Sequence, residues 1–206
     1  MALYDGVMST PAPPDPTRRN ERCRRAILDA ATSLISELGY DHVSIEAIAK
    51  RAGVGKQTIY RWWSSKGAVA LEALDESLAT VVDYQDTGDI VEDLRHHMGG
   101  VTRMISSTQI GPVIQGLLSA AQSDPDLSRA HLAKVIEPAH TAWHERITRA
   151  QRNGELRADA DPDALIDMLF GAMYFRLLLH TRPSEPGQVD DALDIAFRGI
   201  RTVPQP

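Results

Sequence analysis

The sequence is poor in features that would place the protein outside the cytoplasm. It has a single cysteine, Cys23, so no disulfide can form within the chain. No run approaches the ~18 apolar residues of a membrane helix, and the N-terminus lacks the basic and then apolar stretch of a signal sequence. We therefore expect a cytoplasmic protein that does not use a membrane as a partner.

Strand-forming and catalytic patterns are missing as well. No segment alternates apolar and polar residues with the period of two typical of a half-buried strand, and no internal repeat is present. We expect an all-α fold of about nine helices. The sequence also contains no Gly-rich phosphate loop, no nucleophile elbow and no CxxC pair. For this reason we expect no enzyme, no catalytic residue and no cofactor.

The most informative stretch is residues 44–66, SIEAIAKRAGVGKQTIYRWWSSK. An apolar stripe at the spacing i, i+3, i+4, i+7 predicts a short helix, and it consists of Ile45, Ile48, Ala49 and Ala52. Ser44 is placed to cap this helix, and Gly53 supplies the positive φ that a sharp turn requires. A second short helix follows from Gly55 or Lys56 to Trp62. Two helices joined by a tight glycine turn describe a helix-turn-helix.

The second helix presents side chains that suit DNA. Ile59 and Trp63 can pack back on the first helix. The side chains left on the outside are Lys56, Gln57, Thr58, Tyr60 and Arg61. None is acidic, although solvated helix faces are usually rich in Glu and Asp, and Gln, Thr, Lys and Arg pair with base edges and phosphates. The pattern favours a DNA-reading helix over the alternative, an ordinary helical hairpin with a solvated polar face.

The segment AIAKRAGVGKQTIYRWWSSKGAVALEAL resembles the N-terminal signature of TetR-family transcriptional regulators, from about Arg22 to Leu78. The pair Trp62–Trp63 departs from the commoner Tyr/His-Phe of that signature. The resemblance implies a homodimeric regulator of transcription, and we expect a repressor that binds double-stranded DNA at a near-palindromic operator. The residues expected to contact DNA are Ser44, Lys56, Gln57, Thr58, Tyr60, Arg61, Trp62 and Lys66. Gln57 is expected to read a base edge and Lys66 to hold a phosphate.

Charge divides the chain into a basic head and an acidic body. Residues 17–67 contain ten Lys or Arg and five Asp or Glu, a net charge of +5, and the whole chain carries −6, so the remainder carries −11. Such a head can face DNA while the body is repelled from it. We expect a disordered, Pro-rich tail at 1–16, a helix-turn-helix domain at 17–66, and a helical ligand-binding and dimerisation domain at 67–206.

The predicted helix at 162–180 is apolar on nearly every side, so it must be covered on every side. A second copy of the chain can supply the missing cover, together with the following helix at about 188–201. Two helices from each copy would form a four-helix interface, as the family resemblance also implies. The residues expected in this interface are Leu165, Leu169, Ala172, Leu193 and Phe197.

In the resembled family the body encloses an apolar pocket, where a small molecule binds and releases DNA. The residues expected to line such a pocket here are Met98, Arg103, Met104, Gln115, Trp143, Phe170 and Met173. For each of them, an ordinary core or surface position is the alternative. We expect a small, mostly hydrophobic effector. The alternative function is a helical sensor that responds to a metal ion or a protein partner.

One pair of histidines has a metal-binding spacing. His140 and His144 are four residues apart, and Glu137 can share their helix face, a spacing that can bind Zn²⁺. Pro138 distorts the same turn, because it should bend the helix near Lys134–Val135. A solvated or packed histidine pair is therefore favoured, and no metal site is expected.

Overall fold

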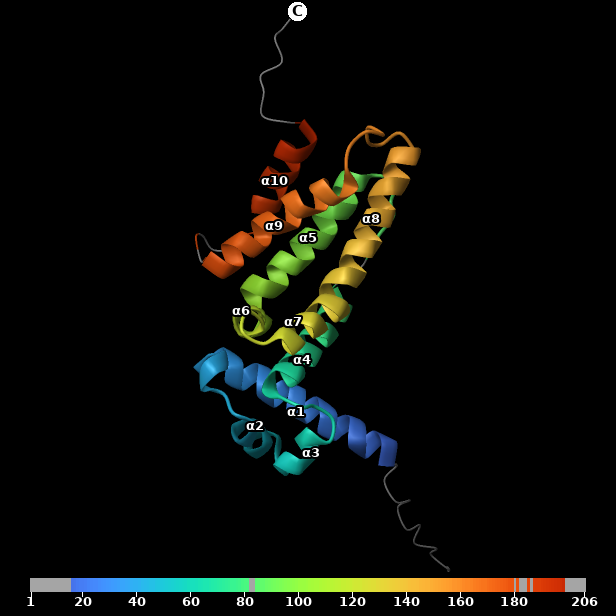
Figure 1. Ribbon diagram of the computed structural model, residues 1–206. Coiled ribbons are helices and arrows are strands. Elements are labelled where there is room, and N and C mark those ends of the chain that lie inside the picture. The colour runs from blue at the N-terminus through green and yellow to red at the C-terminus, as the bar shows by residue number, and fades with distance from the viewer. Residues whose placement is uncertain (1–15, 82–83, 180, 182–184, 186, 199–206) are drawn as a thin grey trace, which may run out of the picture.

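The computed structural model describes residues 16–81, 84–179, 181, 185 and 187–198 (Figure 1). All regular structure within these residues is helical. In chain order the elements are α1 (Pro16–Leu38), the 3-10 turn η1 (Tyr40–His42), α2 (Ile45–Ala52), α3 (Lys56–Tyr60), α4 (Lys66–Val81), α5 (Ile90–Ser107), α6 (Ile110–Ala121), α7 (Pro125–His131), the π-helical turn η2 (Leu132–Ile136), α8 (Glu137–Arg152), α9 (Pro162–Leu179) and α10 (Gly187–Arg198). The all-α prediction is confirmed. The predicted tail lies outside the described residues, apart from Pro16.

The helix-turn-helix forms as its local sequence predicts. The Ser44 hydroxyl accepts a 3.2 Å hydrogen bond from the backbone N–H of Ala47 and so caps α2. Gly53 follows α2 with a φ of 68°, in the left-handed region that glycine adopts most readily. The second helix, α3, ends at Tyr60 and is therefore shorter than predicted. Helices α1 to α3 make up the head of the molecule (Figure 1).

The head and the base of the body share one buried core. Helix α1 packs against α4 and α6 as well as against α2. Tyr40, in η1, lies so close to α6 that a Cβ atom added to Gly116 would be 2.2 Å from the Cβ of Tyr40. Packing is therefore continuous across the boundary predicted between residues 66 and 67.

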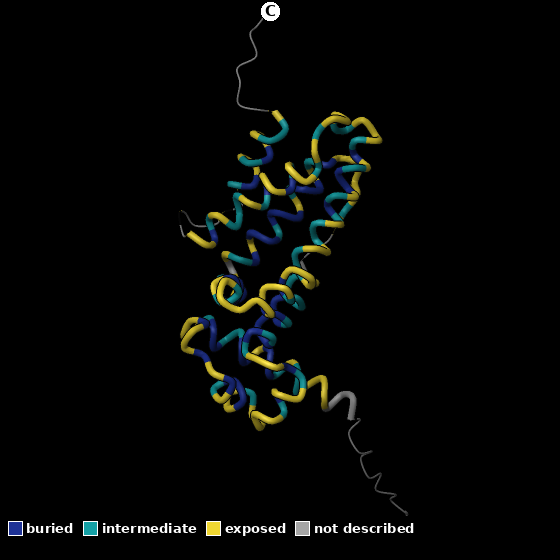
Figure 2. Tube along the Cα trace, in the orientation of Figure 1, coloured by how far each residue is buried: buried dark blue, intermediate teal, exposed yellow. Residues whose placement is uncertain are grey.

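Helices α5, α8, α9 and α10 enclose a second core farther from the head (Figures 1 and 2). The buried guanidinium of Arg146 on α8 lies 2.7 Å from Asp93 on α5 and 3.1 Å from Glu155 after α8. These ion pairs hold α8 against α5. No helix in the described part of the chain is both long and apolar enough to cross a lipid bilayer.

The rod α7–η2–α8 changes its winding where proline enters it. Pro138 has no backbone N–H, and its ring would collide with the carbonyl of Lys134, four residues earlier, in a regular α-helix. The chain adopts a π-helical turn over Leu132–Ile136, directly before this proline. The helix is therefore irregular near Lys134–Val135, as predicted. The irregularity is a π-helical turn. Counting this rod once, the described residues form nine helices, as expected.

Candidate nucleic-acid interface and internal cavity

The short helix α3 lies at the tip of the head, at the end of the molecule opposite α10 (Figure 1). Ile59 is buried beneath it and anchors it to α2. The polar side chains that the sequence placed outside are indeed accessible. Lys56, Gln57, Tyr60 and Arg61 are exposed and Thr58 is half-buried. These side chains form the outer surface of the head.

Most of these groups remain available to a ligand. Lys56 lies 3.5 Å from Glu46, but both side chains are more than half exposed, so the pair is weak and a phosphate can displace Glu46. The Arg61 guanidinium lies 5.1 Å from the centre of the Trp62 ring, over its face. Ser44 uses its oxygen as an acceptor in the α2 cap, and its hydroxyl group also interacts with the carboxylate of Glu46. By contrast, Arg51 is held by Glu37 through two hydrogen bonds of 2.8 Å.

Lys66 does not lie where a phosphate contact requires. Its ammonium group donates to the carbonyl oxygens of Tyr40 at 2.7 Å and Val43 at 3.1 Å, and it lies over the Tyr40 ring. The side chain is half-buried, and it ties the first residues of α4 to the loop between α1 and α2. The expectation that Lys66 holds a phosphate is contradicted by this geometry, because its donors are already used within the protein.

A chain of polar contacts links the recognition end of the head to α4. The indole Nε1 of Trp63 donates to Glu72, Glu72 pairs with Arg24 on α1, and Arg24 also pairs with Glu76 and Glu21. All of these groups except Trp63 are charged, and each has a partner. The network fixes α1, α4 and the residues after α3 relative to one another.

The body contains three neighbouring hollows that share wall residues, and we describe them as parts of one cavity. One part, of about 420 Å³, lies between α8 and α9, and another, of about 290 Å³, lies among α4, α5, η2, α8 and α9. Both include Ile136, Ala139, Phe170 and Tyr174 in their walls. A third part, of about 50 Å³, extends from there towards α6 and shares Val101 and Met173 with the second. We call these three parts together the body cavity.

The predicted lining residues divide into two groups. Trp143, Phe170, Met173 and Met104 line the body cavity. The other three, Met98, Arg103 and Gln115, are not among the wall residues of the body cavity. Met98 lines a separate hollow of about 10 Å³, Arg103 is exposed, and Gln115 donates to the backbone carbonyl of Leu177 at 3.4 Å.

Several cavity residues were missed from the sequence. His97, Tyr84 and Tyr174 all line the cavity. His97 stacks on Tyr84 with ring centres 5.0 Å apart and meets Trp143 edge-on at 5.0 Å. Burial lowers the pKa of His97 to about 4, with a further contribution from His96. Position 97 falls on the buried stripe of α5, three residues after Leu94, and that spacing was the available signal.

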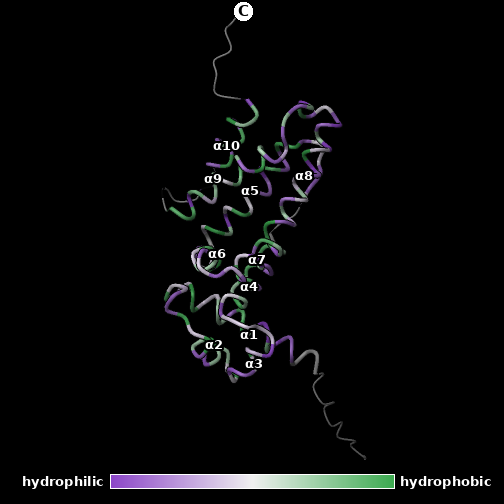
Figure 3. Tube along the Cα trace, in the orientation of Figure 1, coloured by the Kyte–Doolittle hydropathy of each residue, from purple (hydrophilic) through white to green (hydrophobic). Residues whose placement is uncertain are grey.

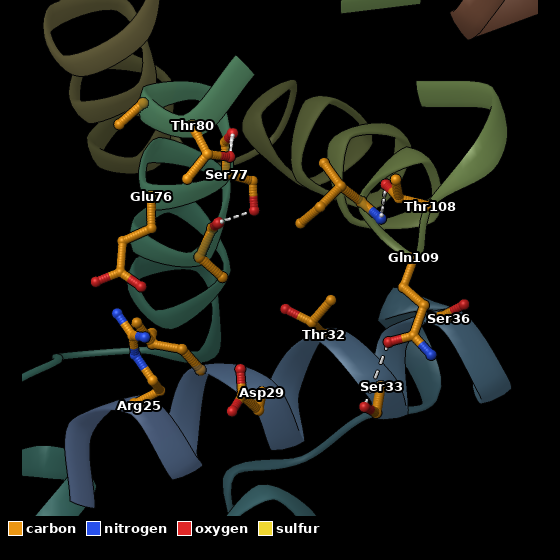
Figure 4. Close-up of a pocket in the computed structure, with 14 residues that line it drawn as sticks. Arg25, Asp29, Thr32, Ser33, Ser36, Glu76, Ser77, Thr80, Thr108 and Gln109 are labelled. Carbon is orange, nitrogen blue, oxygen red and sulfur yellow. Dashed lines mark hydrogen bonds between the residues drawn. The ribbon is translucent and has the colours of Figure 1, made fainter. Parts of the chain in front are cut away.

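A different hollow lies between the head and the body (Figure 4). It is an open groove of about 950 Å³ between α1, α4 and the start of α6. Its walls carry mainly hydroxyl, carboxylate and amide groups, and Ser33 contacts Gln109 across it at 3.4 Å. Because the groove is open and nearly half of its lining is polar, it does not match the apolar pocket that the sequence led us to expect.

The residues expected in the dimer interface also fall into two groups, according to their burial. Leu165, Ala172 and Phe197 are half-buried, but Leu169 and Leu193 are 2% and 1% exposed and belong to the core of the protomer itself. For these two the interface expectation is contradicted, since a partner cannot reach them. The apolar side chains that do face outward on α9 and α10 are Met168, Phe175, Leu178, Leu179 and Ile195. We call these five residues the exposed apolar face. Figure 3 shows that hydrophobic residues are frequent towards the end of α9.

The histidine pair faces an acidic residue. The Nε2 atoms of His140 and His144 lie 3.4 and 3.7 Å from the same carboxylate oxygen of Asp163. Within the described residues, no group of three His, Cys, Asp or Glu side chains is arranged to hold a metal ion. Both histidine side chains are more than a third exposed to solvent.

Comparisons with known proteins agree with this architecture. Residues 27–73 match the family model described as bacterial regulatory proteins, tetR family, and residues 84–196 match tetracyclin repressor-like, C-terminal domain. The HTH-type transcriptional regulator YdeS of Bacillus subtilis is 33% identical, with 89% of this chain and 92% of YdeS covered. The DNA-binding transcriptional repressor TetR of Mycobacteroides abscessus is 31% identical, with 84% and 88% covered. The crystal structure of the TetR family transcription regulator SCO0332 matches with a TM-score of 0.72 and 31% identity, over 88% of this chain and 100% of that chain.

Proposed function

Because this chain belongs to the TetR family of bacterial transcriptional regulators, we propose that it is a homodimeric repressor controlled by a small molecule. The head binds double-stranded DNA through α3. A mostly hydrophobic effector binds in the body cavity and lowers the affinity of the protein for its operator.

The observation that carries this proposal is the position of α4. In its first half, Glu72 accepts the hydrogen bond of Trp63, which follows the recognition helix. One to two turns later, Asp75, Leu78 and Ala79 form part of the cavity wall. A molecule that prefers a different position of this wall must therefore move the helix that holds α3. Coupling of 1–3 kcal/mol between two such sites changes affinity about 5–150-fold.

The operator should have the symmetry of the dimer. Two copies joined through the exposed apolar face would place their recognition helices in successive major grooves, about 34 Å apart or somewhat more. Each helix then reads one half of a near-palindrome. Gln57 is the residue proposed to read a base edge, while Lys56, Thr58, Tyr60, Arg61 and Trp62 surround it, and Ser44 donates to a phosphate.

Selection of binding sites from random double-stranded DNA tests the DNA-binding part. We expect an inverted repeat, and Gln57→Ala should relax preference at one position in each half-site, by about 1–3 kcal/mol. Glu145→Gln, at an exposed position on α8, serves as the control and should select the same repeat as the wild type. Selected sequences without a repeated half-site, or an unchanged preference in Gln57→Ala, would contradict the proposed recognition.

The effector part needs a separate test. A library of small molecules is screened by thermal shift, and each compound that stabilises the protein is then added to the protein–operator complex. We expect at least one apolar compound to raise the melting temperature and to weaken operator binding. If only a metal ion or a protein partner does both, the protein is the helical sensor that the sequence left as the alternative.

A further inference from the structure

Four buried nitrogen atoms beside the body cavity have no hydrogen-bond partner: both ring nitrogens of His131, which lines the smallest part of the cavity, and one nitrogen each in Trp143 and His97. Trp143 is 1% exposed and His97 is 3% exposed, and neither the indole Nε1 of Trp143 nor the Nδ1 of His97 makes a hydrogen bond. Most buried polar groups in folded proteins have a partner, so each exception needs an explanation. An indole N–H can only donate. Whatever satisfies Trp143 must therefore bring an acceptor atom.

Trp143 and His97 lie in one cluster of rings around Phe170. The ring centre of His97 lies 5.0 Å from that of Trp143 and 5.8 Å from that of Phe170, and both pairs are nearly perpendicular. Phe170 lines both large parts of the cavity, with Trp143 in the wall of one and His97 in the wall of the other. Aromatic walls of this kind favour a flat aromatic ligand, which can stack on one ring and meet another edge-on.

The interior of the cavity offers no buried charge to a ligand. The charged residues in its walls are Asp75, Asp167 and Lys134, and these are half-buried or exposed. The buried Arg146 is absent from the lining residues of the body cavity and is paired with Asp93 and Glu155. Burial also keeps His97 uncharged at neutral pH, with a pKa of about 4. A carboxylate or phosphate group in this interior would lose water without gaining a cation.

We propose that the effector is an uncharged aromatic compound with an acceptor oxygen, such as an aryl ketone, whose oxygen accepts a hydrogen bond from Trp143 Nε1. The aromatic part lies against Phe170 and His97, and the His97 Nδ1 is available to a second polar group. This inference rests on the proposed function, since it names the class of molecule for the same cavity.

A matched pair of ligands isolates the hydrogen bond. 2-Acetylnaphthalene carries a ketone oxygen, and 2-isopropylnaphthalene has nearly the same shape without it. Calorimetric titration of the full-length protein without DNA should give a dissociation constant at least about tenfold lower for the ketone, which is the effect of one neutral hydrogen bond to a buried donor. Trp143→Phe keeps an aromatic ring but removes the donor. In this variant the two ligands should bind with equal affinity.

The NMR signal of the wild-type protein tests the same hydrogen bond even if the Trp143→Phe variant fails to fold. The indole proton of Trp143, identified by its absence in the spectrum of Trp143→Phe or by sequential assignment, should move downfield on addition of the ketone and much less with the hydrocarbon.

Equal affinities of the two ligands for the wild type, or no binding of either, would overturn the proposal. So would a requirement for a charged ligand, tested with stearoyl-CoA and benzoate. Operator binding is measured on the same preparation, and a protein that binds DNA but neither naphthalene compound refutes the ligand class without refuting DNA recognition.

Discussion

The indole Nε1 of Trp63 donates a 2.7 Å hydrogen bond to Oε2 of Glu72. Trp63 follows the recognition helix, and Glu72 lies on the helix that continues into the body. Arg24 compensates the charge of Glu72 from α1. One hydrogen bond thus joins the DNA-reading element to the element that borders the cavity.

A double-mutant cycle measures this link. Trp63→Phe keeps the ring in the core but removes the donor, and Glu72→Gln keeps the shape of the acceptor but removes its charge. We expect a coupling free energy of about 1 kcal/mol in the free energy of unfolding, typical of a part-buried hydrogen bond to a charged group. Each single variant should also bind the operator several-fold more weakly, because the end of α3 is less firmly held. Strictly additive effects in both assays would show that the contact does not couple the two elements.

The two lysines at the ends of the recognition segment should behave differently. Lys56→Met removes an exposed charge at α3 and should weaken binding to all DNA sequences, lowering the slope of log affinity against log salt concentration by about one unit. Lys66→Met leaves the carbonyl oxygens of Tyr40 and Val43 without their donor, so it should lower the melting temperature and leave the salt slope unchanged. The reverse pattern would restore the phosphate contact first expected for Lys66.

The contrast between Lys56 and Lys66 shows where sequence reasoning succeeds. Helix positions, the Ser44 cap, the Gly53 turn and the outward side of α3 follow from spacing and local chemistry, which the sequence displays directly. The partner of Lys66 lies 26 positions earlier, at Tyr40, and no local pattern reveals a contact over that separation. The sequence therefore indicates which side chains of α3 are exposed, but it does not reveal the distant partners of Lys66.

The body shows a second limit of the same kind. Helix α9 is apolar on most sides, so its sequence cannot indicate which side packs on its own chain, and Leu169 was assigned to the dimer although it is buried in the protomer. His97 lies on the apolar side of α5, a position that predicts burial but does not reveal a cavity. It is the packing of α5 against α8 and α9 that makes position 97 a cavity wall. The effect of Pro138 was easier to predict from the sequence, because a proline acts locally on the turn that precedes it.

Gly116 should not tolerate a side chain, because Tyr40 lies directly against it. In Gly116→Ala the new Cβ would lie 2.2 Å from Tyr40 Cβ, and neither backbone can yield without separating α6 from the head. We expect a loss of roughly 1–3 kcal/mol in unfolding free energy, as for other overpacked cores. Gly99→Ala is the control, since its Cβ meets only the end of the Arg103 side chain, at 3.3 Å, and alanine is favoured in a helix. A melting temperature for Gly116→Ala equal to that of the control would contradict the tight joint.

The dimer prediction now concerns the exposed apolar face. Phe175 is 56% exposed, so Phe175→Glu should leave the protomer folded but place an unpaired charge in the interface, at a cost of several kcal/mol. Sedimentation should then show a folded monomer with weak operator binding. Leu169→Glu buries the same charge inside the protomer and should abolish the folded state, as seen by circular dichroism. A Phe175→Glu protein that remains dimeric would place the interface elsewhere.

Acid should destabilise the protein through His97. The folded-state pKa of about 4 is below the ordinary value of 6.5, because burial among Tyr84, Trp143 and Phe170 disfavours the charged imidazole. Between pH 6.5 and 4 the unfolded chain therefore binds a proton that the folded protein does not. Stability contributed by neutral His97 is complete above pH 6.5 and is lost as the pH falls towards 4.

Comparison with His97→Phe separates this effect from the titration of carboxylates, which both proteins share. Between pH 7 and 4.5 the wild type should lose about 2–3 kcal/mol more unfolding free energy than the variant, measured by denaturant titration without effector. His96→Gln is the control: His96 is exposed and supplies only the smaller cause of the shift, so its pH profile should run parallel to that of the wild type. Parallel profiles for the wild type and His97→Phe would mean that the imidazole gains a proton in the folded state as easily as in the unfolded one. The cavity wall would then be open to water, which would also remove the reason for expecting an uncharged ligand.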